Sequence, residues 1–180
     1  MEIHRFERLW LGLSIVLVLA LIGTVTYGAV AEGIEMVGGD GDTFESADLD
    51  GTEFEEPGVR QVGEDEYEVY VVARQFFFDP GTSEPIRVPA DSTVTFHVTS
   101  PDVVHGFEIA NTNVNTMVIP GQEAVMEVEF DEPRQYGIVC HEYCGSGHHS
   151  MEGTIQVVPQ SQYNVTAATV NADAAQEGGS

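Results

Sequence analysis

Two cysteines, three histidines and a methionine lie together in residues 140–151, which read CHEYCGSGHHSM. Both cysteines of the chain are in this stretch. Thiolate, thioether and imidazole groups together are ligands that select copper among the common metals. One further histidine, His105, lies upstream in residues 100–107 (SPDVVHGF). These residue types at this spacing predict a metal site.

Several kinds of site fit these residues. Cys140 and Cys144 could form a disulfide outside the cell, and Cys-x3-Cys-x3-His with a distant histidine could hold zinc. Neither of these sites needs Met151. Cys144, His148, Met151 and His105 match a blue-copper site, which leaves Cys140 as a surplus thiolate. Two thiolates can instead bridge two copper ions, each with one histidine and one weak axial ligand.

Six short segments rich in β-branched and aromatic residues must position this stretch. Pro, Gly, Asp and Asn separate them, as is typical of strands joined by turns. The candidate ligands other than His105 fall on the loop between the last two segments. Strands at this spacing predict an all-β Greek-key sandwich or barrel. The expected strands are residues 67–74, 84–88, 92–100, 124–130, 136–140 and 153–158.

The N-terminal segment contains a long apolar run without charge. Residues 9–31 would form a helix about 34 Å long, which is enough to cross a bilayer. Arg5 and Arg8 precede the run and acidic residues follow it, which favours a cytoplasmic N-terminus and a C-terminal domain on the outer face of the cell membrane. The final Ala-Val-Ala would suit a cleaved signal peptide, but a signal core has only about 7–15 residues. We therefore predict one uncleaved transmembrane helix within residues 1–31.

Two other segments lack a packing pattern. Residues 32–62 are rich in Gly, Asp and Glu and show neither a helical nor a strand period. They are predicted to form an acidic linker. Residues 160–180 follow the last expected strand and are predicted to be a disordered tail. The folded domain is accordingly expected at residues 63–159.

The charge of the chain is strongly acidic. Its 180 residues include six Lys plus Arg against thirty Asp plus Glu, which gives a net charge of -24. Two acids and two Arg fall in residues 1–30, so the part beyond the membrane segment carries the whole charge. Such a surface would repel phosphates, which excludes a nucleic-acid partner. A dense carboxylate surface favours adaptation to concentrated salt, and steering of a cationic partner is the alternative.

Two segments together resemble one protein family. Residues 140–151 have the pattern Cys-x-Glu-x-Cys-Gly-x-Gly-His-x-x-Met, and residues 101–107 read PDVVHGF. In both, the chain resembles subunit II of the heme-copper cytochrome c oxidases, which carries the binuclear copper centre CuA. The single N-terminal anchor resembles the B-type branch of that family. The resemblance extends from the anchor to about residue 158 and implies a cupredoxin-like fold.

The resemblance also implies a ligand set for two copper ions. The two thiolates would bridge the ions, and each ion would take one histidine and one weak ligand. The implied ligands are Cys140 and Cys144 as bridges, His105 and Met151 on one ion, and His148 with the backbone carbonyl of Glu142 on the other.

The function implied by the resemblance is electron transfer. A soluble donor, either cytochrome c or a small blue-copper protein, would reduce CuA, and the electrons would pass to heme in subunit I, where oxygen is reduced and protons are pumped. In many members a carboxylate at the position of Glu142 also reaches a magnesium ion shared with subunit I. Phe76, Phe77 and Phe78 correspond to a tryptophan-containing stretch of the mitochondrial-like members, so they are candidates for receiving the electron. Core packing is the alternative for these residues, and it is favoured for two of the three.

Other functions remain open from the residues alone. One is a membrane-anchored monocopper electron carrier or copper chaperone, and another is a structural zinc or disulfide β-domain. His141 and His149 are expected to lie outside the ligand set, and Met117 is expected to pack in the core. Asp102 is expected to fix the loop before His105 through local backbone hydrogen bonds.

Overall fold

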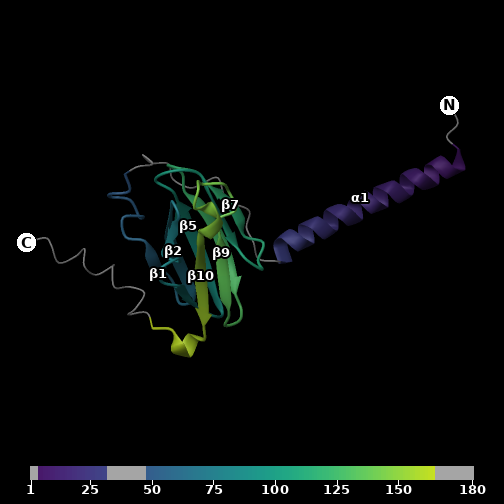
Figure 1. The fold of residues 1–180 in the computed structure, drawn as a ribbon. Coiled ribbons are helices and arrows are strands. Elements are labelled where there is room, and N and C mark those ends of the chain that lie inside the picture. The colour runs from purple at the N-terminus through teal and green to yellow at the C-terminus, as the bar shows by residue number, and fades with distance from the viewer. Residues whose placement is uncertain (1–3, 32–47, 165–180) are drawn as a thin grey trace, which may run out of the picture. The chain divides into compact units, whose positions relative to one another are not determined.

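The computed structural model describes residues 4–31 and 48–164. One helix, α1 (Arg5–Ala31), forms the N-terminal unit, and ten strands form a separate β domain (Figure 1). The prediction of an all-β fold with a single N-terminal helix is therefore confirmed.

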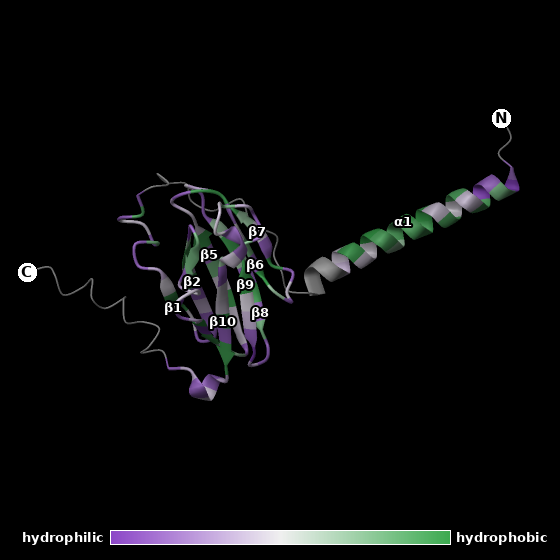
Figure 2. Cartoon of the chain, viewed as in Figure 1, coloured by the Kyte–Doolittle hydropathy of each residue, from purple (hydrophilic) through white to green (hydrophobic). Residues whose placement is uncertain are grey.

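Helix α1 is apolar on all sides. Its Arg5–Tyr27 segment has a mean hydropathy of 2.3, and apolar residues cover the helix between its ends (Figure 2). The carboxylate of Glu7 accepts a hydrogen bond from the backbone N–H of His4 at 2.9 Å, which satisfies one of the free donors at the start of the helix. A helix this long that is apolar all round is suited to a lipid environment.

The strands form two five-stranded sheets. Neighbouring strands are antiparallel except for the pairs β2–β5 and β4–β10, which are parallel. Neighbours are often distant in sequence, so the chain crosses repeatedly between the sheets, as in a Greek-key sandwich. The first sheet has the order β1 (Gly58–Gln61), β2 (Glu66–Arg74), β5 (Ser92–Thr99), β8 (Ala124–Phe130), with β3 (Phe77–Asp79) also paired to β2; the second has the order β4 (Ile86–Pro89), β10 (Glu152–Val158), β9 (Gln135–Val139), β6 (His105–Ile109), β7 (Asn115–Val118).

The core lies between the sheets and is built from alternating side chains. In β5, every second residue from Ser92 to Val98 is buried, as expected of a strand with one face on the core. Phe107 of β6 packs edge-on against Phe78 at 5.7 Å and tilted against Phe96 at 5.8 Å. These rings fix the first sheet against the strand that carries His105.

Residues 48–61, within the segment predicted to be a linker, include ordered structure. Strand β1 pairs with β2, and Leu49 and Phe54 are buried against Tyr70 and Val72. The two apolar residues are isolated among acids and show no period, which is why the sequence did not indicate their packing. Residues 32–47 lie outside the described part.

The chain after β10 begins with a packed turn rather than a free tail. Gln160–Gln162 form a short 3-10 helix, and the ring of Tyr163 packs edge-on against Tyr67 at 5.3 Å. The rest of the predicted tail, residues 165–180, lies outside the described part.

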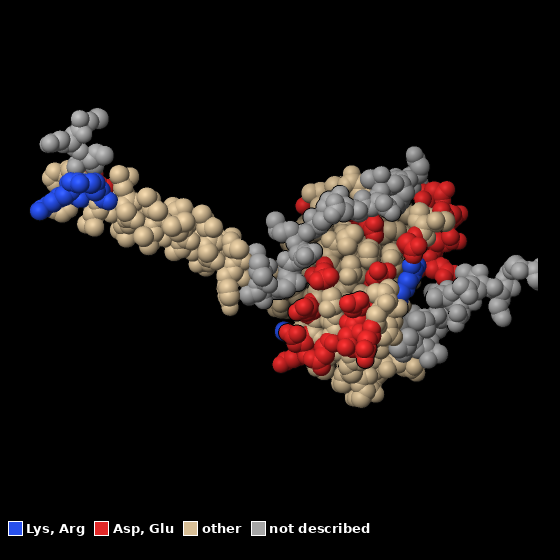
Figure 3. Space-filling view, turned by 180° about the vertical axis from the view of Figure 1, so that it is seen from behind, with Lys and Arg blue, Asp and Glu red and all other residues tan. Residues whose placement is uncertain are grey.

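Carboxylates are the main charged groups on the visible surface of the β domain (Figure 3). Figure 3 shows Asp and Glu side chains crowded over one face, with few Arg among them. Arg60 forms an ion pair with Glu53, and its guanidinium carbon lies 4.1 Å from the centre of the Tyr70 ring. The acidic exterior expected from the composition therefore lies on the β domain.

Candidate metal centre

His105 is the first residue of β6 and is completely buried. Phe107 and Ile109, at alternate positions of the same strand, also point into the core and anchor the strand. The Nε2 atom of His105 lies 2.8 Å from Oδ1 of Asp102, and its Nδ1 atom lies 3.9 Å from Sγ of Cys140. The ring therefore presents Nδ1 to the cysteines.

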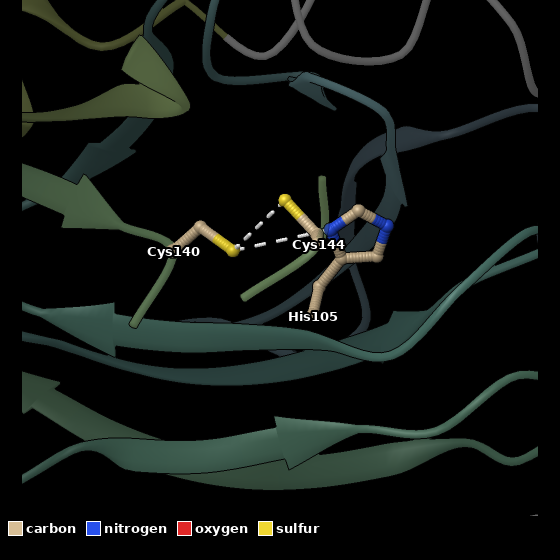
Figure 4. Close-up of side chains that lie close together, drawn as sticks. All are labelled: His105, Cys140 and Cys144. Carbon is tan, nitrogen blue, oxygen red and sulfur yellow. Dashed lines mark hydrogen bonds between the residues drawn. The ribbon is translucent and has the colours of Figure 1, made fainter. Parts of the chain in front are cut away.

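The two cysteines lie at the start of the loop between β9 and β10. Cys140 follows β9 directly and Cys144 comes four residues later; both are buried and neither is in a disulfide. Their Sγ atoms are 3.8 Å apart. The ligand atoms of His105, Cys140 and Cys144 all lie within 4.8 Å of one another, so the three form a candidate metal site (Figure 4).

The other three predicted ligands lie around the same pair of sulfurs. Nδ1 of His148 and Sδ of Met151 each lie 3.7 Å from Sγ of Cys144. The backbone carbonyl oxygen of Glu142 lies 3.3 Å from Sγ of Cys140. The structure thus brings all six predicted residues together, with different neighbours around each sulfur.

Local backbone geometry folds the loop around the sulfurs. Gly145 has φ 133°, a conformation that side chains rarely adopt. His148–Ser150 then form one 3-10 turn, and the backbone N–H of Cys140 donates to the carbonyl of Met151 at 3.2 Å. This last bond closes the loop between its first and last ligand residues.

Asp102 is the partner of the buried histidine. Its carboxylate also accepts hydrogen bonds from the backbone N–H of Val103 at 2.6 Å and from the hydroxyl of Ser100 at 3.0 Å. Partial burial alone would raise the pKa of Asp102, but the bonds from His105, backbone N–H groups and Ser100 outweigh it and lower that pKa. The expected backbone contact is present, and the contact with the ring of His105 is additional.

The donor set fits a soft metal cation. Burial, followed by the hydrogen bond and charge of Cys140, raises the pKa of the Cys144 thiol to about 11. The protein surroundings alone therefore do not stabilise two adjacent thiolates, whereas a bound cation would. Thiolate, imidazole and thioether donors on one small site are the combination that copper prefers.

The neighbouring histidines lie outside this group. His141 packs over Gly106, where an added Cβ would lie 2.3 Å from its Nδ1 atom, and that nitrogen is buried without a hydrogen-bond partner. His149 is exposed.

The three phenylalanines before the site have different surroundings. Phe78 is in the core against Phe107. Phe76 is half-buried and packs on the ligand loop, since a Cβ added at Gly147 would lie 2.5 Å from its ring. Phe77 is 37% exposed.

Comparison with known proteins identifies a family whose model matches most of the β domain. The family model described as "Cytochrome C oxidase subunit II, periplasmic domain" matches residues 60–158. One cytochrome c oxidase subunit 2 of Thermus thermophilus is 35% identical over 163 residues, covering 86% of this chain and 93% of the relative. A second subunit 2 from Thermus thermophilus is 44% identical over 99 residues, or 55% of this chain and 71% of the relative.

Two solved structures extend the comparison to the fold. A chain of a heme-copper terminal oxidase dimer is 36% identical with a TM-score of 0.67, over 86% of this chain and all of that chain. The periplasmic domain of subunit II from Bradyrhizobium japonicum, at 20% identity and TM-score 0.50 over 56% of this chain and 90% of that chain, shares the cupredoxin-like fold. The chain therefore belongs to the cytochrome c oxidase subunit II family and is a subunit of a heme-copper oxidase.

Proposed function

We propose that the chain accepts single electrons at a binuclear CuA centre and delivers them to heme in the neighbouring subunit. The observation that carries this proposal is the pair of free cysteine sulfurs 3.8 Å apart, each with its own further donors. Cys140 has His105 and the carbonyl of Glu142 nearby, and Cys144 has the two remaining donors. A single copper ion would not use both sulfurs and both histidines in the three-ligand blue-copper arrangement.

The residues of the chain would hold the centre and keep its shape. Cys140 and Cys144 would bridge the ions as thiolates, His105 and Met151 would bind one ion, and His148 with the carbonyl of Glu142 would bind the other. Two copper ions held this way supply a one-electron couple shared between them. Asp102 would keep the ring of His105 in the tautomer that presents Nδ1, and would increase its basicity.

The position of the ligands supports fast electron transfer. His105 is in a buried strand, and Cys140 and Met151 flank the strands β9 and β10, which pair with each other. Backbone bonds within the loop fix the remaining ligands. A scaffold that moves little between redox states lowers the reorganisation energy of each electron transfer.

The electron would arrive over the β2–β3 turn. Phe77 is exposed there, and Phe76 lies against the ligand loop. We assign these two side chains to contact with a soluble donor, either cytochrome c or a small blue-copper protein. Phe78 is fully within the core and would support the turn rather than contact the donor.

A second surface would contact the heme-bearing subunit. Met117 is opposite Gly106, and Val139 is opposite Glu108, so the side chains of Met117, Val139 and Glu108 lie on the outer face of the second sheet. Met117 is 50% exposed and Val139 is 42% exposed, contrary to the expectation that Met117 packs in the core. Tyr143, on the ligand loop, is 78% exposed. Apolar groups on an otherwise acidic domain favour burial against a partner, and the other oxidase subunit is the partner we assign.

The side chain of Glu142 is a candidate ligand for magnesium at that contact. It is half-exposed on the loop, and its backbone carbonyl already faces Cys140. Carboxylate oxygen suits magnesium, which keeps several waters and takes few protein ligands. We propose that the partner subunit would complete this site.

The anchor would place the β domain on the outer face of the cell membrane. Arg5 and Arg8 precede the apolar part of α1, and the acidic domain follows it. Basic residues at the start of a first helix favour a cytoplasmic N-terminus. The domain could then meet a soluble donor outside the cell.

Rapid mixing of the purified oxidase with reduced donor tests this function. Reduction at the copper site should precede heme reduction, and a Cys144→Ser complex should lose the rapid phase. Heme reduction at the normal rate in that variant would contradict the proposal. Repeating the measurement over a salt series separates the roles of the acidic surface: a steep fall indicates steering of the donor, and a flat rate indicates adaptation to salt.

A further inference from the structure

Gln75 touches both segments that carry the candidate ligands. It lies in the turn between β2 and β3, next to Phe76, and is itself exposed. His105 and Cys144 are 39 positions apart in the numbering and lie on separate segments of the chain. A residue from the first sheet therefore joins two segments whose relative position determines the geometry of the site.

The backbone of Gln75 reaches the histidine segment. Its N–H donates to Oδ2 of Asp102 at 2.8 Å, while Oδ1 of the same carboxylate lies 2.8 Å from Nε2 of His105. Asp102 is thus fixed from both sides, by the ring that it orients and by the turn of the other sheet. The bond from Gln75 restricts rotation of the carboxylate away from His105.

The side chain of Gln75 reaches the cysteine segment. Its Nε2 donates a hydrogen bond to the backbone carbonyl of Cys144. The fit is close: a Cβ added at Gly145 would lie 2.8 Å from the same Nε2 atom and 3.0 Å from the ring of Phe76. Glycine at this position allows Gln75 and Phe76 to lie directly on the loop.

We propose that Gln75 is a positioning residue that fixes the histidine segment and the cysteine loop relative to each other. Its backbone N–H acts through Asp102 and its side-chain amide acts on Cys144, so one residue sets the separation of His105 and the two sulfurs. It does not itself contact a metal. The inference rests on the proposed CuA function for its spectroscopic consequence, but not for its effect on the metal-free loop.

The test replaces Gln75 with Met in the full chain. Gln75→Met keeps the length of the side chain and removes its donor without adding charge. Gln61→Met is a matched control, because Nε2 of Gln61 also donates to backbone carbonyls, those of Gly63 at 2.9 Å and Glu64 at 3.0 Å, in the distant β1–β2 turn. The control should reproduce any general effect of losing a surface amide.

The first measurement is the rate at which Cys140 and Cys144 react with a thiol reagent in the metal-free chain. Both cysteine residues are only 3% exposed, so reaction requires the loop to open. Losing one hydrogen bond should raise the open population, and hence the rate, by about fivefold in Gln75→Met. Gln61→Met should react like the parent chain. Equal rates in all three proteins would overturn the proposal.

The second measurement is the EPR spectrum of the copper-loaded full chain. Gln75→Met should change the copper hyperfine splitting at an unchanged copper content, whereas Gln61→Met should not. Gln75→Asn is a second variant, because its shorter side chain cannot reach the carbonyl of Cys144, and it should behave like Gln75→Met in both measurements. An unchanged spectrum with unchanged thiol rates would refute the positioning role. Failure of the parent chain to bind copper, together with a fivefold faster thiol reaction in Gln75→Met, would refute the CuA function and leave the positioning role supported.

Discussion

The carboxylate of Asp102 is hydrogen-bonded to Nε2 of the buried His105 ring. The distance from Oδ1 to Nε2 is 2.8 Å, and Nδ1 on the other side of the ring faces Cys140. A carboxylate in this position fixes the tautomer and raises the basicity of a metal-binding histidine. The same carboxylate is held by three further donors, so its orientation is determined by the fold.

Asp102→Asn should weaken copper binding without unfolding the domain. The amide can still bond to its neighbours but does not carry the negative charge that increases the basicity of His105. We expect the affinity for copper to fall by about 10–100-fold. Competition with a copper chelator measures it. An affinity equal to that of the parent chain would show that the contact does not affect the site.

The weak ligand and the bridging ligand of the cysteine loop give different predictions. Met151→Leu should retain two coppers and shift the redox potential, because the thioether is a weak ligand and leucine has a similar volume. Cys144→Ser should abolish the EPR signal of an electron shared by two coppers, because it removes one bridge. Persistence of that signal in Cys144→Ser would show that the bridging assignment is wrong.

The exposed apolar residues Met117, Val139 and Tyr143 give a prediction about assembly with the heme-bearing subunit. Met117→Glu should reduce the amount of heme-bearing subunit that co-purifies with the chain by more than about tenfold, since burying an unpaired carboxylate costs several kcal/mol. Val62→Glu is the control, because Val62 is similarly exposed, at 55% against 50%, in the distant β1–β2 turn. Equal recovery with both variants would exclude Met117 from the contact.

Tyr163 gives a prediction about alkaline stability. Burial, with a smaller effect of Tyr67, raises the pKa of Tyr163 from 10.0 to about 12. Between these two pH values the unfolded chain releases a proton that the folded chain keeps. The contribution of Tyr163 to folding stability is therefore fully present below pH 10 and is lost as the pH rises to about 12.

The Tyr163→Phe variant should therefore lose less stability between pH 10 and pH 12 than the parent chain. The hydroxyl of Tyr163 is buried without a hydrogen-bond partner, so its removal should cost little stability at neutral pH. The measurement is the thermal unfolding midpoint of both proteins from pH 8 to pH 12. Curves of the same slope above pH 10 would contradict the assignment.

The sequence predicted six strands because their segments are rich in β-branched or aromatic residues and are separated by turn residues. All six expected segments contain strands, from β2 to β10. Strands β1, β3, β6 and β7 have three to five residues and were not predicted, and β6 begins with the unusual pair His105-Gly106. Length alone does not distinguish them from β4 and β9, which have four and five residues. The ordered residues before β1 depend on contacts with Tyr70 that no local pattern indicates.

The candidate ligands were predictable because most of them share one short loop. His105 was a candidate because it is a metal-binding residue type directly after a predicted strand, and the family resemblance then implied its place in the ligand set. The contact between Gln75 and Cys144 joins residues 69 positions apart and depends on how the two sheets pack, so sequence alone gave no signal for it. The role of Asp102 was partly visible, since it lies three residues before His105.

The most direct test of the account is the EPR spectrum and metal content of the copper-loaded full chain. We predict two coppers per chain and one unpaired electron with hyperfine coupling to both. Coupling to a single copper would instead indicate a monocopper carrier. Zinc alone, or a stable disulfide between Cys140 and Cys144 in the native membrane protein, would contradict a binuclear copper centre altogether.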